Sequence, residues 1–154
     1  MRAYRTLRNT IRFQLGTLHD FSSEENRVEV SRMQMIDRWA LAKTAFLASE
    51  VSVAYEHYEL HKVVQLVNRY CSGVLSSTYH DIIKDRLYTL HFNDPKRRST
   101  QSAVQLIFET LVRLIGPIVP FTADEAWSFY RTGKRMSDFP IALEDWPESP
   151  IDWS

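Results

Sequence analysis

The fold is decided first by residues 2–18, which read RAYRTLRNTIRFQLGTL. Apolar side chains recur in this stretch at steps of three and four, so they form one stripe along a helix: Tyr4, Leu7, Ile11, Leu15 and Leu18. A second stripe, on a different side of the same helix, carries Arg2, Arg5, Arg8 with Asn9, and Arg12. The stretch therefore predicts a helix with one side against a core and a separate cationic side.

The helical period continues along the chain. Apolar stripes and helix-ending residues predict a helix over residues 36–57, one from residue 60 that ends at Gly73, further helical turns over 74–90, and one that begins at Asp94-Pro95 and ends at Gly116-Pro117. The spacing of Thr122 and Glu125 is that of a capping box, which places the start of a last helix there.

These patterns predict an all-α fold. We expect an antiparallel bundle of about five or six helices over residues 1–132. We expect residues 133–154 to form an extended acidic tail, containing prolines and tryptophans, that packs on the bundle or leaves it.

Composition limits the class of protein. The 154 residues are 44% hydrophobic and 25% charged, which fits one globular domain rather than a disordered chain. The single cysteine, Cys71, excludes an internal disulfide framework and a multi-cysteine zinc site. The first residues are charged, and the apolar stretch 114–123 is short and contains two prolines. We therefore expect no signal peptide, no membrane span and a cytoplasmic protein.

The net charge of zero hides an uneven distribution. The first twelve residues hold four arginines and no acid, whereas the residues after Arg135 hold five acids and no base. Arginine outnumbers lysine by 14 to 5, and its guanidinium group can bind phosphate oxygens with two hydrogen bonds. This asymmetry is a hint of an anionic partner.

Sequence motifs of several enzyme classes are absent. The chain has no phosphate-binding loop, no dinucleotide-binding glycine motif and no nucleophile elbow. His57 and His61 lie one turn apart, but Glu59 does not follow the first histidine as it does in a zinc protease, so a helix junction is favoured over a metal site. Cys71 lies in an apolar stripe and is predicted to be a buried thiol. Asp81 and Asp85 alternate with basic residues, which favours a solvated face.

The arginine stripe of residues 2–12 allows two interpretations. It could be an ordinary solvated face. However, no acid lies three or four residues from these arginines within the helix, so they repel one another. Phe13 and Phe21 are nearby in the sequence, and aromatic rings beside arginines are typical of sites that hold unstacked bases.

Four stretches resemble a known family. The run Tyr4–Phe13, the run Leu75–Thr89, and Arg97-Arg98-Ser99 with residues 120–127 (PFTADEAW) resemble the helical anticodon-binding domain of bacterial-type isoleucyl-tRNA synthetases. The similarity extends in order over residues 2–130. The pattern in residues 120–127 is shared with valyl and leucyl relatives, whereas the run KDRLYT at residues 84–89 favours the isoleucyl family.

The resemblance implies a function in binding without chemistry. The parent would be a class I ligase for ATP-dependent aminoacylation, with zinc in some relatives. The catalytic signatures of that class are absent here, so the resemblance implies a fragment that carries no cofactor. Its expected partners are the anticodon stem-loop of tRNA(Ile) and the remaining domains of the synthetase. No membrane partner is expected, and the fragment is expected to be monomeric.

The resemblance also nominates residues for RNA binding. In relatives, the first helix of this domain and the loop after it approach the anticodon. Carried over position by position, this nominates the following residues of this chain: Arg5, Arg8, Asn9 and Arg12 on the helix, Phe21 in the loop, and Lys84 and Arg86 as contacts to the RNA backbone. The open alternatives are the anticodon-binding domain of a valyl or leucyl relative and a helical protein-interaction module.

Overall fold

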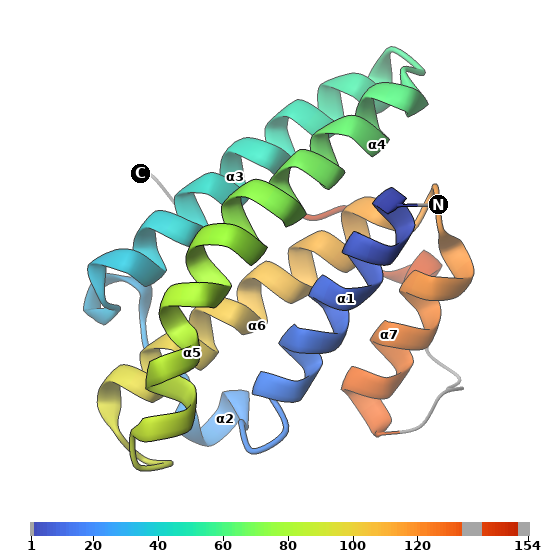
Figure 1. Cartoon of the computed structure of the whole chain (residues 1–154). Helices are drawn as coiled ribbons and strands as arrows, with labels where there is room; N and C mark the ends of the chain where they lie inside the picture. The colour runs from blue at the N-terminus through green and yellow to red at the C-terminus, as the bar shows by residue number, and fades with distance from the viewer. Residues whose placement is uncertain (1, 134–139, 151–154) are drawn as a thin grey trace.

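The computed structural model describes residues 2–133 and 140–150, and the regular secondary structure in these ranges is helical (Figure 1). The α-helices are α1 (Arg2–Thr17), α2 (Ser23–Asn26), α3 (Met35–Glu56), α4 (Leu60–Arg69), α5 (His80–Thr89), α6 (Pro95–Ile115) and α7 (Pro120–Thr132). Short 3₁₀ turns occupy Val30–Arg32 and Ile141–Leu143, and a π-helical segment, η2, spans Tyr70–Tyr79. These ranges contain no strand, so the predicted all-α class is confirmed. Nor do they contain a helix long and apolar enough to span a bilayer.

Helix α6 forms the centre of the bundle. Its apolar residues Ala103, Val104, Ile107, Phe108 and Leu111 are completely buried. Helices α1, α3, α5 and α7 all pack against it. Figure 1 shows that α3 and α4 run in opposite directions, as do α1 and α6. These two pairs are antiparallel, as predicted from the sequence.

The prediction that a helix ends at Gly73 is wrong. The backbone remains helical from α4 through η2 into α5, with Gly73 inside the π-helical segment. A glycine that ends a helix takes a left-handed conformation, but of the described glycines only Gly133 has a positive φ. Tyr70, Cys71, Leu75 and Tyr79 are buried along this segment. Their burial outweighs the roughly 1 kcal/mol that a glycine costs within a helix.

The predicted capping box at Thr122 is also wrong. Helix α7 begins two residues earlier, at Pro120, and no side chain caps its first turn. The Thr122 hydroxyl instead pairs with the Tyr4 hydroxyl of α1 at 2.9 Å. At α6 the local signals hold, because Asp94 accepts a 2.8 Å hydrogen bond from the Lys96 amide and the helix ends before Gly116.

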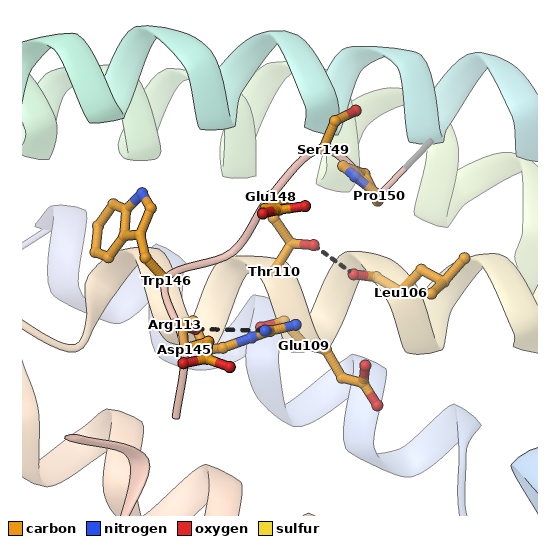
Figure 2. Close-up of a pocket in the computed structure, with 9 residues that line it drawn as sticks. All are labelled: Leu106, Glu109, Thr110, Arg113, Asp145, Trp146, Glu148, Ser149 and Pro150. Carbon is orange, nitrogen blue, oxygen red and sulfur yellow. Dashed lines mark hydrogen bonds between the residues drawn. The ribbon is translucent and has the colours of Figure 1, made fainter. Parts of the chain in front are cut away.

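The described part of the tail, residues 140–150, lies against α7, α6 and α3. Ile141 is buried, and its amide donates to Asp124 of α7 at 2.8 Å. Trp146 donates from Nε1 to the Ser52 hydroxyl of α3 at 2.9 Å. Figure 2 shows this segment crossing α6 on the side away from α1. In Figure 1, where α1 lies in front of α6, the same segment passes behind α6.

The turn between α3 and α4 contains a strained residue. Tyr58 has a φ of 58°, in the left-handed region, and the residue is 89% exposed. Its amide donates to the Tyr55 carbonyl, and the next amide, of Glu59, donates to the Ala54 carbonyl at 2.8 Å. These bonds close the end of α3 at a position where glycine is usual.

Replacing Tyr58 with glycine should stabilise the chain by about 0.5–1 kcal/mol. The substitution removes a left-handed conformation that costs an L-residue about 1–2 kcal/mol. Part of this gain is lost because glycine has more conformational freedom in the unfolded chain. The measurement is the free energy of unfolding in urea. Tyr88→Gly is the matched control, because Tyr88 is 79% exposed in helical backbone and its replacement should destabilise. If both substitutions changed the free energy of unfolding equally, the backbone of Tyr58 would not be strained.

Candidate nucleic-acid interface

The arginines of α1 lie on the surface. Arg2, Arg5, Arg8 and Arg12 are all exposed, while the opposite side of the helix buries Leu7, Thr10, Ile11 and Gln14. Within residues 2–133 and 140–150, no ion pair or side-chain hydrogen bond engages Arg5, Arg8 or Arg12. We call these three residues with the exposed Asn9 the α1 cationic face. Its guanidinium groups can meet an anion without breaking a contact of the fold.

One edge of α1 is fixed to η2 and α5 by an aromatic contact. The Phe13 ring stacks on the His80 ring with centroids 4.4 Å apart. His80 is buried, and its Nε2 has no hydrogen-bond partner among the described residues. Burial, followed by the positive charge of Lys84, lowers the pKa of His80 to about 4. The ring is therefore neutral at physiological pH.

Lys84 extends the positive surface beside α1. It is exposed, and it follows His80 by one turn of α5, so both residues lie on the same side of that helix. Because His80 contacts Phe13 of α1, this side of α5 is the one next to α1. Lys84 therefore lies on the side of α5 that carries the contact between His80 and Phe13.

Arg86 has a different environment. Its Nη1 lies 3.7 Å from Oδ2 of Asp37, a completely buried carboxylate at the start of α3. Tyr79 donates to the same carboxylate at 2.6 Å, and Ser99 at 2.8 Å. Burial raises the pKa of Asp37, although these hydrogen bonds and the Arg86 charge oppose the rise. The structure thus directs Arg86 into the fold, away from the α1 cationic face.

Phe21 lies in the connection after α1 and is partly buried against the core. The preceding residue, Asp20, fixes this connection to α6. Its carboxylate accepts two hydrogen bonds from Arg97, at 2.8 and 3.2 Å, and one from Gln101 at 2.7 Å. Burial alone would raise the pKa of Asp20, but the hydrogen bonds and charge of Arg97 outweigh it and the pKa is lowered.

Sequence reasoning missed two carboxylates that join elements of the fold, the partly buried Asp20 and the completely buried Asp37. Asp37 did carry a usable signal, because it lies three, four and seven residues before Ala40, Leu41 and Thr44, which are all buried. That spacing places it on the core side of α3. Asp20 carried no such signal in the sequence, because it lies in a polar connection and its partners are far along the chain.

The other residues singled out from the sequence are either buried in the core or exposed on the surface. Cys71 is completely buried, and burial raises its pKa to about 12, which confirms the predicted structural thiol. His57 and His61 are both exposed, and no cluster of three potential metal ligands occurs within the described ranges. Asp81 and Asp85 are exposed, as expected for a solvated face.

A groove lies on the side of α6 away from α1. It has a volume of about 680 Å³ between α6 and the tail, and is lined by Leu106, Glu109, Thr110, Arg113 and residues 145, 146 and 148–150. Figure 2 shows Arg113 donating to the Glu109 carbonyl and Thr110 to the Leu106 carbonyl. The acids Asp145 and Glu148 lie here, so these two acids of the tail do not cover the α1 cationic face.

Comparison with known proteins gives a consistent set of relatives. The family model for the anticodon-binding domain of tRNA ligase matches residues 37–154. The chain is 43% identical over 143 residues to the isoleucine–tRNA ligase of Baumannia cicadellinicola, covering 93% of this chain and 15% of that ligase. It is 41% identical over 151 residues to that of Geobacter sulfurreducens, covering 98% and 16%. The corresponding values for Prochlorococcus marinus are 38% over 150 residues, 97% and 15%. The chain thus spans about 15% of the length of these curated relatives.

Proposed function

This chain belongs to the family of anticodon-binding domains of tRNA ligases, and from that premise we propose that it binds the anticodon stem-loop of an isoleucine tRNA. The relatives bear the name isoleucine–tRNA ligase, which supports isoleucine as the specificity of the parent protein. The observation that carries the proposal is the α1 cationic face, whose arginines are exposed and free of ion pairs within the described ranges.

In this proposal the chain recognises RNA and performs no reaction. Residues 1–132 form the recognition unit and residues 133–154 its tail. ATP-dependent aminoacylation, with any zinc that some relatives carry, belongs to parts of a cytoplasmic ligase beyond this domain. The role of this chain is to hold the anticodon end of the tRNA while those parts act on the acceptor end.

The contacts follow from side-chain chemistry. Arg5, Arg8 and Arg12 bind phosphates or base edges through paired hydrogen bonds, and Asn9 offers a donor and an acceptor to one base. Lys84 neutralises a phosphate from the neighbouring helix. Phe21 presents the uncovered part of its ring to a base at the end of α1. Arg86 reaches the RNA only by leaving Asp37, so its larger role is to join α5 to α3.

Replacing Arg12 with alanine should weaken stem-loop binding and leave the fold intact, because the side chain is exposed and unpaired among the described residues. Removing one phosphate contact should reduce the slope of log affinity against log salt by about 0.7. The measurement is titration of a fluorescent tRNA(Ile) anticodon stem-loop at several salt concentrations. Arg38→Ala, an exposed arginine of α3, is the matched control and should bind as the parent chain does.

Three outcomes would oppose the proposal. Unchanged affinity and salt dependence in Arg12→Ala would remove Arg12 from the interface. A stem-loop with a valine anticodon, bound as tightly as the isoleucine one, would contradict the isoleucine specificity. Failure of the parent chain to bind any stem-loop would favour a protein-interaction module.

A further inference from the structure

Two aromatic side chains lie in solvent at one end of the α1 cationic face. Phe121, in the first turn of α7, is 90% exposed, and Tyr4 of α1 is 46% exposed. The hydrogen bond of 2.9 Å between the hydroxyls of Tyr4 and Thr122 holds the two helix ends together. Figure 1 shows α1 and α7 side by side with their amino-terminal ends at the same end of the bundle.

The Phe121 ring does not pack in the core of the bundle. The core side of α7 is formed by Ala123, Ala126 and Trp127, which are buried, while Phe121 points to water. A large apolar ring left almost wholly exposed contributes little to folding and keeps an apolar surface in solvent. Its position therefore suits contact with a partner.

The charges around these rings favour a polyanion over an apolar protein surface. Arg5 directly follows Tyr4, and Arg8 lies one turn further along α1; both are exposed and unpaired in the described chain. On α7, Phe129 is 47% exposed and follows Thr122 by two turns, so it lies on the edge that faces α1. One acid, Glu125, lies between Phe121 and Phe129, and the two arginines of α1 outnumber it.

Aromatic rings beside exposed arginines match the chemistry of an unpaired nucleotide. The flat ring of phenylalanine or tyrosine stacks on a base, and arginine binds the phosphates on either side. A partner protein would have to supply carboxylates for at least three free guanidinium groups as well as an apolar surface for the rings. A single-stranded RNA loop carries both features in every nucleotide.

We propose that Tyr4 and Phe121 form a stacking platform for an unpaired base of the RNA loop whose phosphates the α1 cationic face binds. This inference rests on the proposed function and extends its site from α1 to α7. It adds two aromatic residues, from the amino-terminal ends of two helices, to a surface otherwise built from cations.

The test is binding of the tRNA(Ile) anticodon stem-loop to Phe121→Ala and Phe121→Trp. Phe121→Ala should bind about tenfold more weakly, within the range for loss of one base–aromatic stack, while Phe121→Trp should bind as well as the parent chain. The salt slope should be unchanged in both, because no charge is removed. Phe46→Ala is the control, since Phe46 is 65% exposed on α3, which packs against α4 and α6.

A second measurement reports stacking directly. Loop bases are replaced one at a time by a fluorescent adenine analogue whose emission is quenched by stacking. One position should be quenched on binding to the parent chain and should recover its emission with Phe121→Ala. Unchanged affinity and quenching in Phe121→Ala, with weaker binding of Arg12→Ala, would overturn the platform and leave the proposed function standing. No stem-loop binding by the parent chain would overturn both.

Discussion

Replacing Asp37 with alanine should lower the free energy of unfolding by about 3–5 kcal/mol, the usual cost of removing one partner from a buried ion pair. The Asp37 side chain is completely buried and accepts hydrogen bonds from Tyr79, Ser99 and Thr100, with Arg86 3.7 Å away. Alanine leaves three hydroxyls without their acceptor and one guanidinium without its counter-charge. This one carboxylate joins α3 to η2, α5 and α6, so the loss affects most of the bundle.

The measurement is unfolding in urea followed by circular dichroism. Asp81→Ala is the matched control, because Asp81 is an exposed acid of α5 and its loss should change stability by no more than about 0.5 kcal/mol. The double variant Asp37→Leu with Arg86→Met should recover part of the loss, since it removes both charges. A cost below about 1 kcal/mol for Asp37→Ala would show that the carboxylate does not hold these helices together.

Acidification from pH 7 to pH 5 should destabilise the chain by roughly 2 kcal/mol through His80 alone. The folded pKa of His80 is about 4, against an ordinary value of 6.5, because the ring is buried and Lys84 is nearby. Below pH 6.5 the imidazole of His80 is therefore protonated in the unfolded chain, whereas in the folded chain it stays neutral until near pH 4. The contribution of His80 to the free energy of unfolding is therefore fully present above pH 6.5 and declines as the pH falls from 6.5 toward 4.

His80→Phe should remove this decline. Phenylalanine keeps the ring contact with Phe13, and it has no nitrogen to leave without a partner in the core. Thermal unfolding at half-unit pH steps measures the effect, and the difference between the two proteins isolates His80 from the carboxylates that also titrate in acid. Parallel curves for the two proteins between pH 7 and pH 5 would show that His80 does not titrate as its burial requires.

Local sequence signals predicted part of the fold. The apolar stripe of α1, the Asp94 cap of α6 and the end of α6 before Gly116 depend on residues within one or two turns of each other. The sequence therefore predicted these elements and the exposed position of the α1 arginines.

Distant contacts decided the rest. Thr122 has the spacing of a cap, but its hydroxyl pairs with Tyr4, 118 residues away in the sequence. Gly73 stays helical because its neighbours in η2 are buried by other elements. Arg97 resembles a solvated charge at a helix start, but it is buried against Asp20, 77 residues before it. Periodicity and motif spacing contain no information on such pairs, and the proximity of Phe121 to α1 could not be predicted for the same reason.

The described tail crosses α6 on the side away from α1, so charges of opposite sign lie on the two sides of this helix. Arg5, Arg8 and Arg12 lie on the α1 side, and Asp145 and Glu148 lie on the other. A chain with zero net charge gains no general attraction to a polyanion. Charges separated in this way do experience a torque in the field of a polyanion, which turns α1 toward the polyanion and the tail away from it before any contact forms.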